Sequence, residues 1–343
     1  MQAAMLSAGR LVVGDIPRPE PAHQEALVRI KTAGVCHSDL HIARQEWLGG
    51  RTSGLLGHEA IGIVEALGPG ADGFSQVGDR VIVGLGGSGG GYWCGACRHC
   101  LEGRTRLCAQ SKGIMGTYAE YIGVWAKSLV KLPDTIGDHD VPLACAGLTA
   151  YGAVKKLVKF NVLPGSPIAV VGAAGGLGHY AVQIATHFGY KVVGVDVGAD
   201  KVAFVKSLGA HSAVDVSEAR DVVARDFPEG VHASLVFSPR MAGFTLGMDV
   251  LARRGVFISI GIPAHSEGNI EIAPFELFRK EPLIMASAVG TVQDMRELVQ
   301  LAADGNVKTH VSRTGRLSEL PTIFDEREAG AYSGRAILTD LAN

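Results

Sequence analysis

Four cysteines lie close together on one stretch of the sequence. Cys94, Cys97 and Cys100 are separated by two residues each, and Cys108 follows after seven more. Four thiolates on one short loop are enough to close a tetrahedral shell around zinc without an open position. The spacing therefore predicts a structural zinc site. An iron–sulfur cluster is the alternative, but its fourth cysteine usually follows after three residues and precedes proline, whereas Cys108 precedes Ala109.

The other two cysteines, Cys36 and Cys145, are far apart in the sequence, and His58 lies between them. Taken singly, each has an ordinary explanation, since lone cysteines are usually small core residues and lone histidines usually lie on the surface or in satisfied core positions. Together they form a series of motifs: CHSDLH from residue 36, GHE from residue 57 and PLACAG from residue 142. This combination of ligand types indicates a second metal site.

A glycine-rich turn separates the apolar run IAVV from the helix-like segment HYAVQIATHFG. The turn holds Gly172, Gly175, Gly176, Leu177 and Gly178. Backbone N–H groups in such a turn, together with the N-terminus of the following helix, can hold a pyrophosphate. One extra alanine makes the spacing G-x-x-G-x-x-G rather than the usual G-x-G-x-x-G.

An acidic residue, Asp196, ends the next strand-like run, KVVGVDVG. A carboxylate at this place hydrogen-bonds both ribose hydroxyls of a dinucleotide and repels a 2′-phosphate. The sequence therefore predicts binding of NAD rather than NADP.

These motifs, in this order and at nearly these distances, make the chain resemble the zinc-dependent alcohol dehydrogenases of the medium-chain dehydrogenase/reductase family over essentially its whole length. The resemblance implies that Cys36, His58 and Cys145 hold a catalytic zinc and leave its fourth position to water or substrate oxygen. It also implies reversible hydride transfer between NAD and a small primary or secondary alcohol, or the corresponding aldehyde or ketone.

The resemblance assigns further roles near the zinc. Glu59 matches the acidic neighbour that approaches the metal during ligand exchange, and Asp39 matches the residue that fixes the His58 ring. Ser38 and His41 match a relay that takes the alcohol proton and delivers it to solvent. For the cofactor, His37 and Arg335 match positions against the pyrophosphate. Thr149 falls near the nicotinamide, and Lys201 near the ribose.

Two places depart from the family pattern. The stretch between Val83 and Cys94 is longer and richer in glycine, and the stretch from Cys108 to Tyr118 is shorter. A phosphate-binding function of the glycine-rich loop 84–91 is disfavoured, because the Lys-Ser/Thr of a P-loop does not follow it. We expect a mobile loop there, with Tyr92 or Trp93 near the pocket.

The elements that must position these residues fall into two classes. Up to about residue 146 the sequence reads as short strands broken by glycine and proline, such as EALVRIKTAGV. From about 147 it alternates apolar strands with helices, as in a doubly wound parallel sheet. With the resemblance, we expect a GroES-like β-barrel catalytic domain over 1–147 and 285–343 and a Rossmann NAD-binding domain over 148–284, with the active site in the cleft between them.

Length and composition limit the partners. A chain of 343 residues favours two domains, and a net charge of −2 without long like-charge runs argues against nucleic acid or anionic lipid as partners. No apolar run is long enough for a membrane span and no secretory signal is evident, so a cytoplasmic location is expected. The resemblance also implies a homodimer or homotetramer.

Rival functions remain open at this point. A polyol, threonine or cinnamyl-type dehydrogenase of the same family is one alternative, although Cys145 disfavours the polyol type and Asp196 disfavours NADP-dependent enzymes. Zinc-free quinone reductases share the fold but lack the ligand set. A noncatalytic NAD(H)- or zinc-binding sensor would have no use for Cys36, His58 and Cys145 together.

Overall fold

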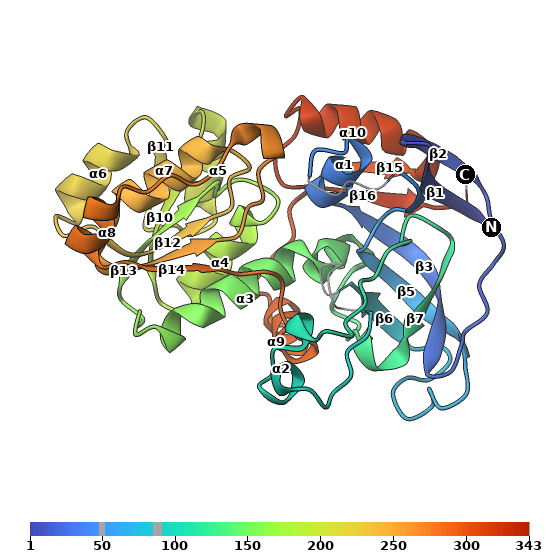
Figure 1. The fold of residues 1–343 in the computed structure, drawn as a ribbon. Coiled ribbons are helices and arrows are strands. Elements are labelled where there is room, and N and C mark those ends of the chain that lie inside the picture. The colour runs from blue at the N-terminus through green and yellow to red at the C-terminus, as the bar shows by residue number, and fades with distance from the viewer. Residues whose placement is uncertain (48–51, 85–90, 343) are drawn as a thin grey trace. The chain divides into compact units, whose positions relative to one another are not determined.

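The computed structural model describes residues 1–47, 52–84 and 91–342, and it divides into two compact units. Unit 1 comprises residues 1–148, 289–305 and 309–343, and unit 2 comprises residues 149–288 and 306–308. The two units are coloured along the chain in Figure 1. Residues 85–90 of the glycine-rich loop lie outside the described part of the chain, as do residues 48–51.

Unit 1 is built mainly of antiparallel strands. A sheet in the order β15-β16-β3-β5-β6-β8 has β7 paired to β3 as well, and a small sheet has the order β2-β1-β4. The larger sheet consists of β3 (Glu25–Val35), β5 (Ala60–Leu67), β6 (Arg80–Val83), β7 (Tyr121–Trp125), β8 (Val130–Lys131), β15 (Val311–Arg316) and β16 (Arg335–Asp340). The smaller one consists of β1 (Gln2–Ser7), β2 (Arg10–Asp15) and β4 (Gly54–Leu55).

Short helices complete unit 1. They are α1 (His37–Ala43), α2 (Arg98–Leu101), α9 (Val292–Ala303) and α10 (Leu320–Glu328), with a 3-10 helix at Asp138–Ala144. The core combines alternate side chains of the strands, such as Ala26, Val28 and Ile30 of β3, with Leu320 and Phe324 of α10. The residues between them are also largely covered, since the burial along β3 is nearly continuous.

Unit 2 is a parallel six-stranded sheet in the order β11-β10-β9-β12-β13-β14. With β9 counted as the first strand, this is the 3-2-1-4-5-6 order of dinucleotide-binding folds. The strands are β9 (Pro167–Val171), β10 (Lys191–Asp196), β11 (Ser212–Asp215), β12 (Val231–Val236), β13 (Leu251–Ser259) and β14 (Leu283–Ala286). The expected α/β fold class, a β-rich domain plus a doubly wound parallel sheet, is confirmed.

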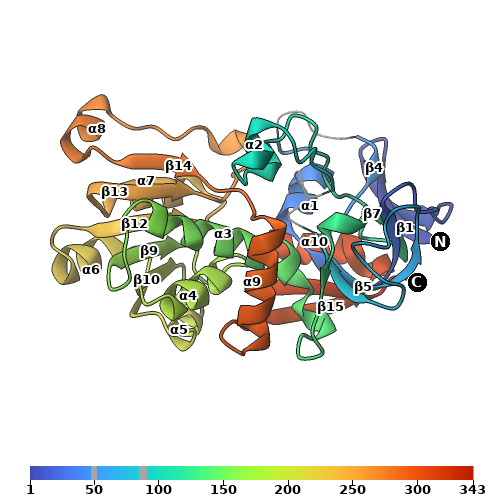
Figure 2. The same ribbon diagram turned by 90° about the horizontal axis from the view of Figure 1, so that it is seen from below.

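Helices connect the parallel strands and pack on the sheet, as Figures 1 and 2 show. They are α4 (Gly178–His187), α5 (Ala199–Ser207), α6 (Ala219–Asp226), α7 (Met241–Asp249) and α8 (Pro274–Lys280), and α3 (Ala146–Lys159) begins at the end of unit 1. Central strands such as β9 are continuous apolar runs because both faces are covered: Ile168, Ala169 and Val170 are fully buried.

Tyr92 and Trp93, which follow the glycine-rich loop, pack on Trp125 of β7. The ring centroids lie 5.0 Å and 4.6 Å from the Trp125 ring, and Trp93 is buried. In this structure both aromatic rings therefore serve the packing of unit 1.

Candidate metal centres and cofactor site

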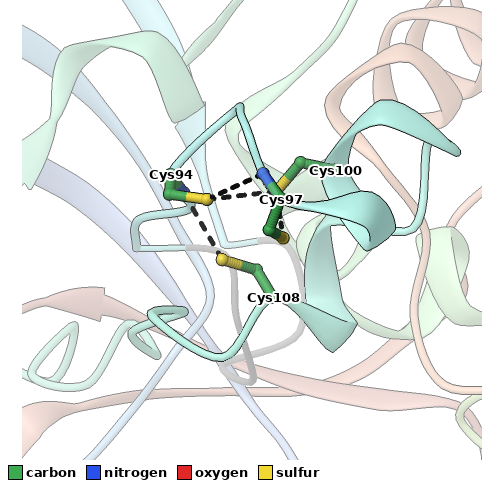
Figure 3. Close-up of side chains that lie close together, drawn as sticks. All are labelled: Cys94, Cys97, Cys100 and Cys108. Atoms are coloured by element: carbon green, nitrogen blue, oxygen red, sulfur yellow. Dashed lines mark hydrogen bonds between the residues drawn. The ribbon is translucent and has the colours of Figure 1, made fainter.

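The four-cysteine loop brings its sulfur atoms together. The Sγ atoms of Cys94, Cys97, Cys100 and Cys108 all lie within 4.8 Å of one another, and none of them is in a disulfide (Figure 3). The Cys97–Cys100 and Cys94–Cys100 Sγ distances are 3.6 Å and 4.0 Å. Zinc–sulfur bonds of about 2.3 Å in a tetrahedron place the sulfurs about 3.8 Å apart, so the four residues fit a structural zinc ion.

The backbone of this loop supports thiolates. The Cys97 N–H donates to the Cys94 sulfur at 3.3 Å, and the Gln110 N–H donates to the Cys108 sulfur at 3.4 Å. Backbone hydrogen bonds from Ala96 and Cys97 lower the pKa of Cys94 to about 6. The thiolate is the form that binds metal, so these bonds favour the ligand state of Cys94, whereas burial raises the pKa of Cys100 to about 12.

The second group of candidate metal ligands lies entirely within unit 1. Its members are Cys36 at the start of α1, His58 and Glu59 before β5, and Cys145 directly after the 3-10 helix Asp138–Ala144. One ligand atom from each lies within 4.8 Å of the others, and all four residues are buried. A short turn reaches this position because Gly57 adopts φ +88°, where a Cβ atom would lie 2.6 Å from the Tyr118 nitrogen.

Asp39 sets the orientation of His58. Its Oδ1 accepts from the Gly57 N–H at 3.0 Å and bonds the His58 Nδ1 at 3.2 Å, and its Oδ2 accepts from the Tyr118 hydroxyl at 2.9 Å. With Nδ1 engaged, the His58 Nε2 is the atom left to face Cys36 and Cys145. A carboxylate behind a ligating histidine is the usual way to fix the ring and raise its basicity.

The ionisable groups of this site have pKa values shifted in different directions. The hydrogen bond with Cys36, followed by burial, holds the pKa of Cys145 well above its usual range. The hydrogen bond from Cys145, followed by the charge of His58, holds the pKa of Cys36 well below its usual range. Burial lowers the pKa of His58, but the charges of Asp39 and Cys36 outweigh it and raise that pKa well above its usual range. Thiolate and imidazole are the donors that zinc prefers, so the residues fit the ion.

Glu59 is held by Arg335 rather than by solvent. The Arg335 Nη2 lies 2.5 Å from both carboxylate oxygens, and both side chains are buried. Burial still raises the pKa of Glu59 to about 7, because the desolvation cost exceeds the effect of the Arg335 charge. Gly34 of β3 leaves the room for this carboxylate, since a Cβ there would lie 2.0 Å from its Oε2.

In unit 2 the glycine-rich turn joins β9 to α4. Gly172 has φ +84°, Gly176 is buried in the turn, and Leu177 is the N-cap of α4. A Cβ on Gly178 would lie 2.0 Å from the Gly172 carbonyl oxygen. The glycines thus let the helix N-terminus approach the strand closely, as a pyrophosphate site requires.

Asp196 ends β10 beside this turn. Its carboxylate accepts from the Ala174 N–H and the Val197 N–H, each at 2.8 Å, and lies 3.9 Å from the Lys201 Nζ. The side chain keeps 11% of its surface exposed. The acid, the lysine and the turn are therefore brought together in one place.

Comparisons with known proteins agree with this geometry. The family described as alcohol dehydrogenase GroES-like domain matches residues 22–134, and the one described as zinc-binding dehydrogenase matches residues 176–304. An alcohol dehydrogenase of Geobacillus stearothermophilus is 36% identical, covering 98% of this chain and 99% of that protein. The chain belongs to the zinc-dependent alcohol dehydrogenases of the medium-chain dehydrogenase/reductase family.

Solved structures of relatives have the same fold. The alcohol dehydrogenase of the archaeon Aeropyrum pernix matches with a TM-score of 0.87 and 31% identity, over 99% of this chain and 100% of that one. The acetophenone reductase of Geotrichum candidum, solved in complex with NAD, matches with a TM-score of 0.85 and 27% identity, over 100% and 98% of the two chains. The chain is thus an NAD-dependent oxidoreductase with zinc as its metal.

Among the described residues no helix is long and apolar enough to cross a membrane.

The remaining predicted site residues of this alcohol dehydrogenase are distributed over both units. Ser38 is half-buried and His41 buried on α1, and the His37 and His41 ring centroids lie 4.5 Å apart. Thr149 is buried on α3 in unit 2. Arg335 is buried at the start of β16 and bonded to Glu59.

Sequence reasoning missed three residues: Gly34 and Tyr118, which contact Glu59 and Asp39 beside the second group of candidate ligands, and Glu46, whose carboxylate bonds the His41 Nδ1. Gly34 and Tyr118 lie on segments distant from the motifs they serve, and their types carry no ligand signal. Glu46 follows the CHSDLH motif closely, but an isolated glutamate after a helix is ordinarily a surface residue.

Proposed function

We propose that this enzyme oxidises small primary or secondary alcohols to aldehydes or ketones with NAD, and catalyses the reverse reduction. The observation that carries the proposal is the buried group Cys36, His58 and Cys145 with Asp39 behind the imidazole. Three protein ligands leave one position for a substrate oxygen. A purely structural zinc site would use four ligands, as the four-cysteine loop does.

Zinc held by these residues would supply Lewis-acid polarisation of the alcohol or carbonyl oxygen. The chain itself provides the other requirements. Cys36 and Cys145 balance the ionic charge, Asp39 keeps His58 in one tautomer, and the ion pair with Arg335 keeps the Glu59 carboxylate beside the ligands. We propose that Glu59 approaches the metal when its oxygen ligand exchanges.

For the cofactor, we propose that the turn of Gly172, Gly175, Gly176 and Leu177 holds the pyrophosphate and that Asp196 and Lys201 hold the adenosine ribose. The Ala174–Asp196 bond keeps the carboxylate against the turn. We further assign His37 and Arg335 to the pyrophosphate and Thr149 to the nicotinamide. The Arg335 Nε is buried without a partner among the described residues, which leaves one donor for an anionic group.

Oxidation of an alcohol releases a proton as well as a hydride. We propose that Ser38 receives that proton and that His41 passes it on towards solvent. The hydroxyl is half-buried and the imidazole buried on the same helix, which suits proton transfer away from bulk water.

We propose that the catalytic domain spans residues 1–147 and 285–343 and that residues 148–284 form the domain that binds NAD.

We also propose that the enzyme is a homodimer or homotetramer. Strand β14 is the edge of the parallel sheet and exposes Leu283 and Ile284 at 46% and 45%. On α8, Phe275 and Phe278 are 70% and 80% exposed. An edge strand beside such apolar surface suits a second copy related by a two-fold axis. A reducing cytoplasm would keep the zinc thiols available.

The function is tested by NADH formation at 340 nm with a panel of primary, secondary, aromatic and polyol alcohols. Each is run with NAD and NADP, before and after chelation. We expect chelator-sensitive turnover of simple alcohols with NAD. Turnover of polyols alone would move the enzyme to a different branch of the family, and silence of zinc-replete protein across the panel would contradict the proposal.

A further inference from the structure

We propose that Glu46 is the group through which protons leave His41 for solvent. The inference rests on the proposed relay of Ser38 and His41. The His41 side chain is only 6% exposed, so the imidazole has little contact with bulk water. The Glu46 carboxylate bonds the His41 Nδ1 and is 31% exposed. A carboxylate that touches both the ring and the solvent connects the two.

The backbone holds Glu46 over His41. After α1, Gln45 adopts the left-handed conformation with φ +56°, and its N–H donates to the Ile42 carbonyl at 3.2 Å. The Glu46 N–H then donates to the His41 carbonyl at 3.0 Å. This pair of bonds is the Schellman arrangement, which returns the chain over the last turn of the helix. The position of Glu46 is therefore set by the end of the helix as well as by its side chain.

Aromatic rings cover other sides of the imidazole. The Trp47 ring stacks on His41 with a centroid distance of 4.9 Å, and the His37 ring lies at 4.5 Å. The nearby cation on the same turn, Arg44, is paired with Asp325 and Glu328 of α10. Glu46 is thus the acid that bonds the imidazole from the solvent side.

The step involves only N–H and O–H bonds. The His41 Nε2 accepts a proton, and the resulting imidazolium releases the Nδ1 proton to an oxygen of Glu46. The neutral carboxyl group then ionises into water, and a 180° flip of the ring brings the protonated nitrogen back to the Glu46 side for the next turnover. One proton enters at Nε2 and one leaves at Glu46, so charge and atoms balance.

The test compares Glu46→Gln with unmodified enzyme in a single turnover, measured as stopped-flow NADH formation. Glutamine keeps an acceptor for the ring but cannot carry the proton. Because positioned proton-transfer groups contribute about 10²–10⁴-fold, we expect a loss of about tenfold or more. Imidazole buffer at increasing concentration should restore the rate, since it replaces the missing base. Glu65→Gln is the matched control, because that side chain is 33% exposed and pairs with arginine on the surface.

Each outcome has a distinct meaning. An unchanged rate for Glu46→Gln would overturn the inference, and so would a slow rate that buffer does not rescue, since Glu46 would then only orient the ring. His41→Gln separates the levels: if it is as fast as the unmodified enzyme, the relay itself is wrong. If the unmodified enzyme forms no NADH with any alcohol, the proposed function fails and the inference fails with it.

Discussion

The buried network Tyr118–Asp39–His58 shows how single residues far apart in sequence determine one ligand. Asp39 accepts three hydrogen bonds, from Gly57, His58 and Tyr118, and has no solvent contact. Burial and the Asp39 charge hold the pKa of Tyr118 well above its usual range, so its hydroxyl remains a donor. The His58 ring is therefore oriented before any metal arrives.

Asp39→Asn is expected to weaken the catalytic zinc site. The amide removes the charge that supports the imidazole, and such outer partners are worth about 10–100-fold in metal affinity. Tyr118→Phe should have the same effect in smaller degree, since it removes one bond from Asp39. The measurement is the zinc retained per chain after dialysis against a graded chelator. Asp79→Asn, which breaks a surface pair with Lys131, is the control. Retention equal to that of unmodified protein would show that Asp39 does not support the site.

At the scale of elements, the junction of β9, α4 and β10 was predictable from sequence. The run IAVV, the glycines and the acid ending KVVGVD are local patterns, and the structure confirms a strand at Pro167–Val171, a helix at Gly178–His187 and a strand at Lys191–Asp196. Likewise, the segment EALVRIKTAGV forms β3. Patterns of this kind depend on neighbours in sequence, so they can be read without a structure.

Asp196→Ala is expected to reduce the preference for NAD. The substitution removes the acceptor of the ribose hydroxyls and the charge that repels a 2′-phosphate. A charge-assisted hydrogen bond is worth about 1.5–3 kcal/mol, or about 10–100-fold. The ratio of kcat/KM with NAD to that with NADP should fall by about this factor. Asp215→Ala at the end of the neighbouring strand β11 provides the comparison, and equal ratios in both variants would remove Asp196 from the ribose site.

Contacts between distant segments were not predictable. Asp39 and Tyr118 are 79 residues apart, and Glu59 and Arg335 are 276 apart. Nothing local in GTYAEY marks its first tyrosine, Tyr118, as a partner of Asp39. Likewise, the room that Gly34 leaves for Glu59 depends on the pairing of β3 with β5. The sequence could name the candidate ligands, but the residues that hold them in place depend on strand pairing.

At the scale of the whole molecule, the exposed face of β14 and α8 bears on assembly. We expect Ile284→Lys to reduce the oligomer, because a lysine at the sheet edge would have to lose its water in the interface. Light scattering during size-exclusion chromatography would show a shift towards 35.9 kDa, the mass of one chain. Val77→Lys tests another exposed apolar position, at 63% exposure in unit 1. An oligomer that survives Ile284→Lys unchanged would place the interface elsewhere.

The central claim is that the group Cys36, His58 and Cys145 holds the zinc that alcohol oxidation needs. It is tested most directly by the rate of NADH formation of Cys36→Ser and Cys97→Ser, each measured with its zinc content. We predict that both variants lose zinc, and that Cys36→Ser also loses turnover of the best alcohol by at least about 10³-fold, the scale of several kcal/mol from a metal Lewis acid. Folded Cys97→Ser protein should retain turnover. A Cys36→Ser enzyme that oxidises alcohols at the unmodified rate would contradict the account.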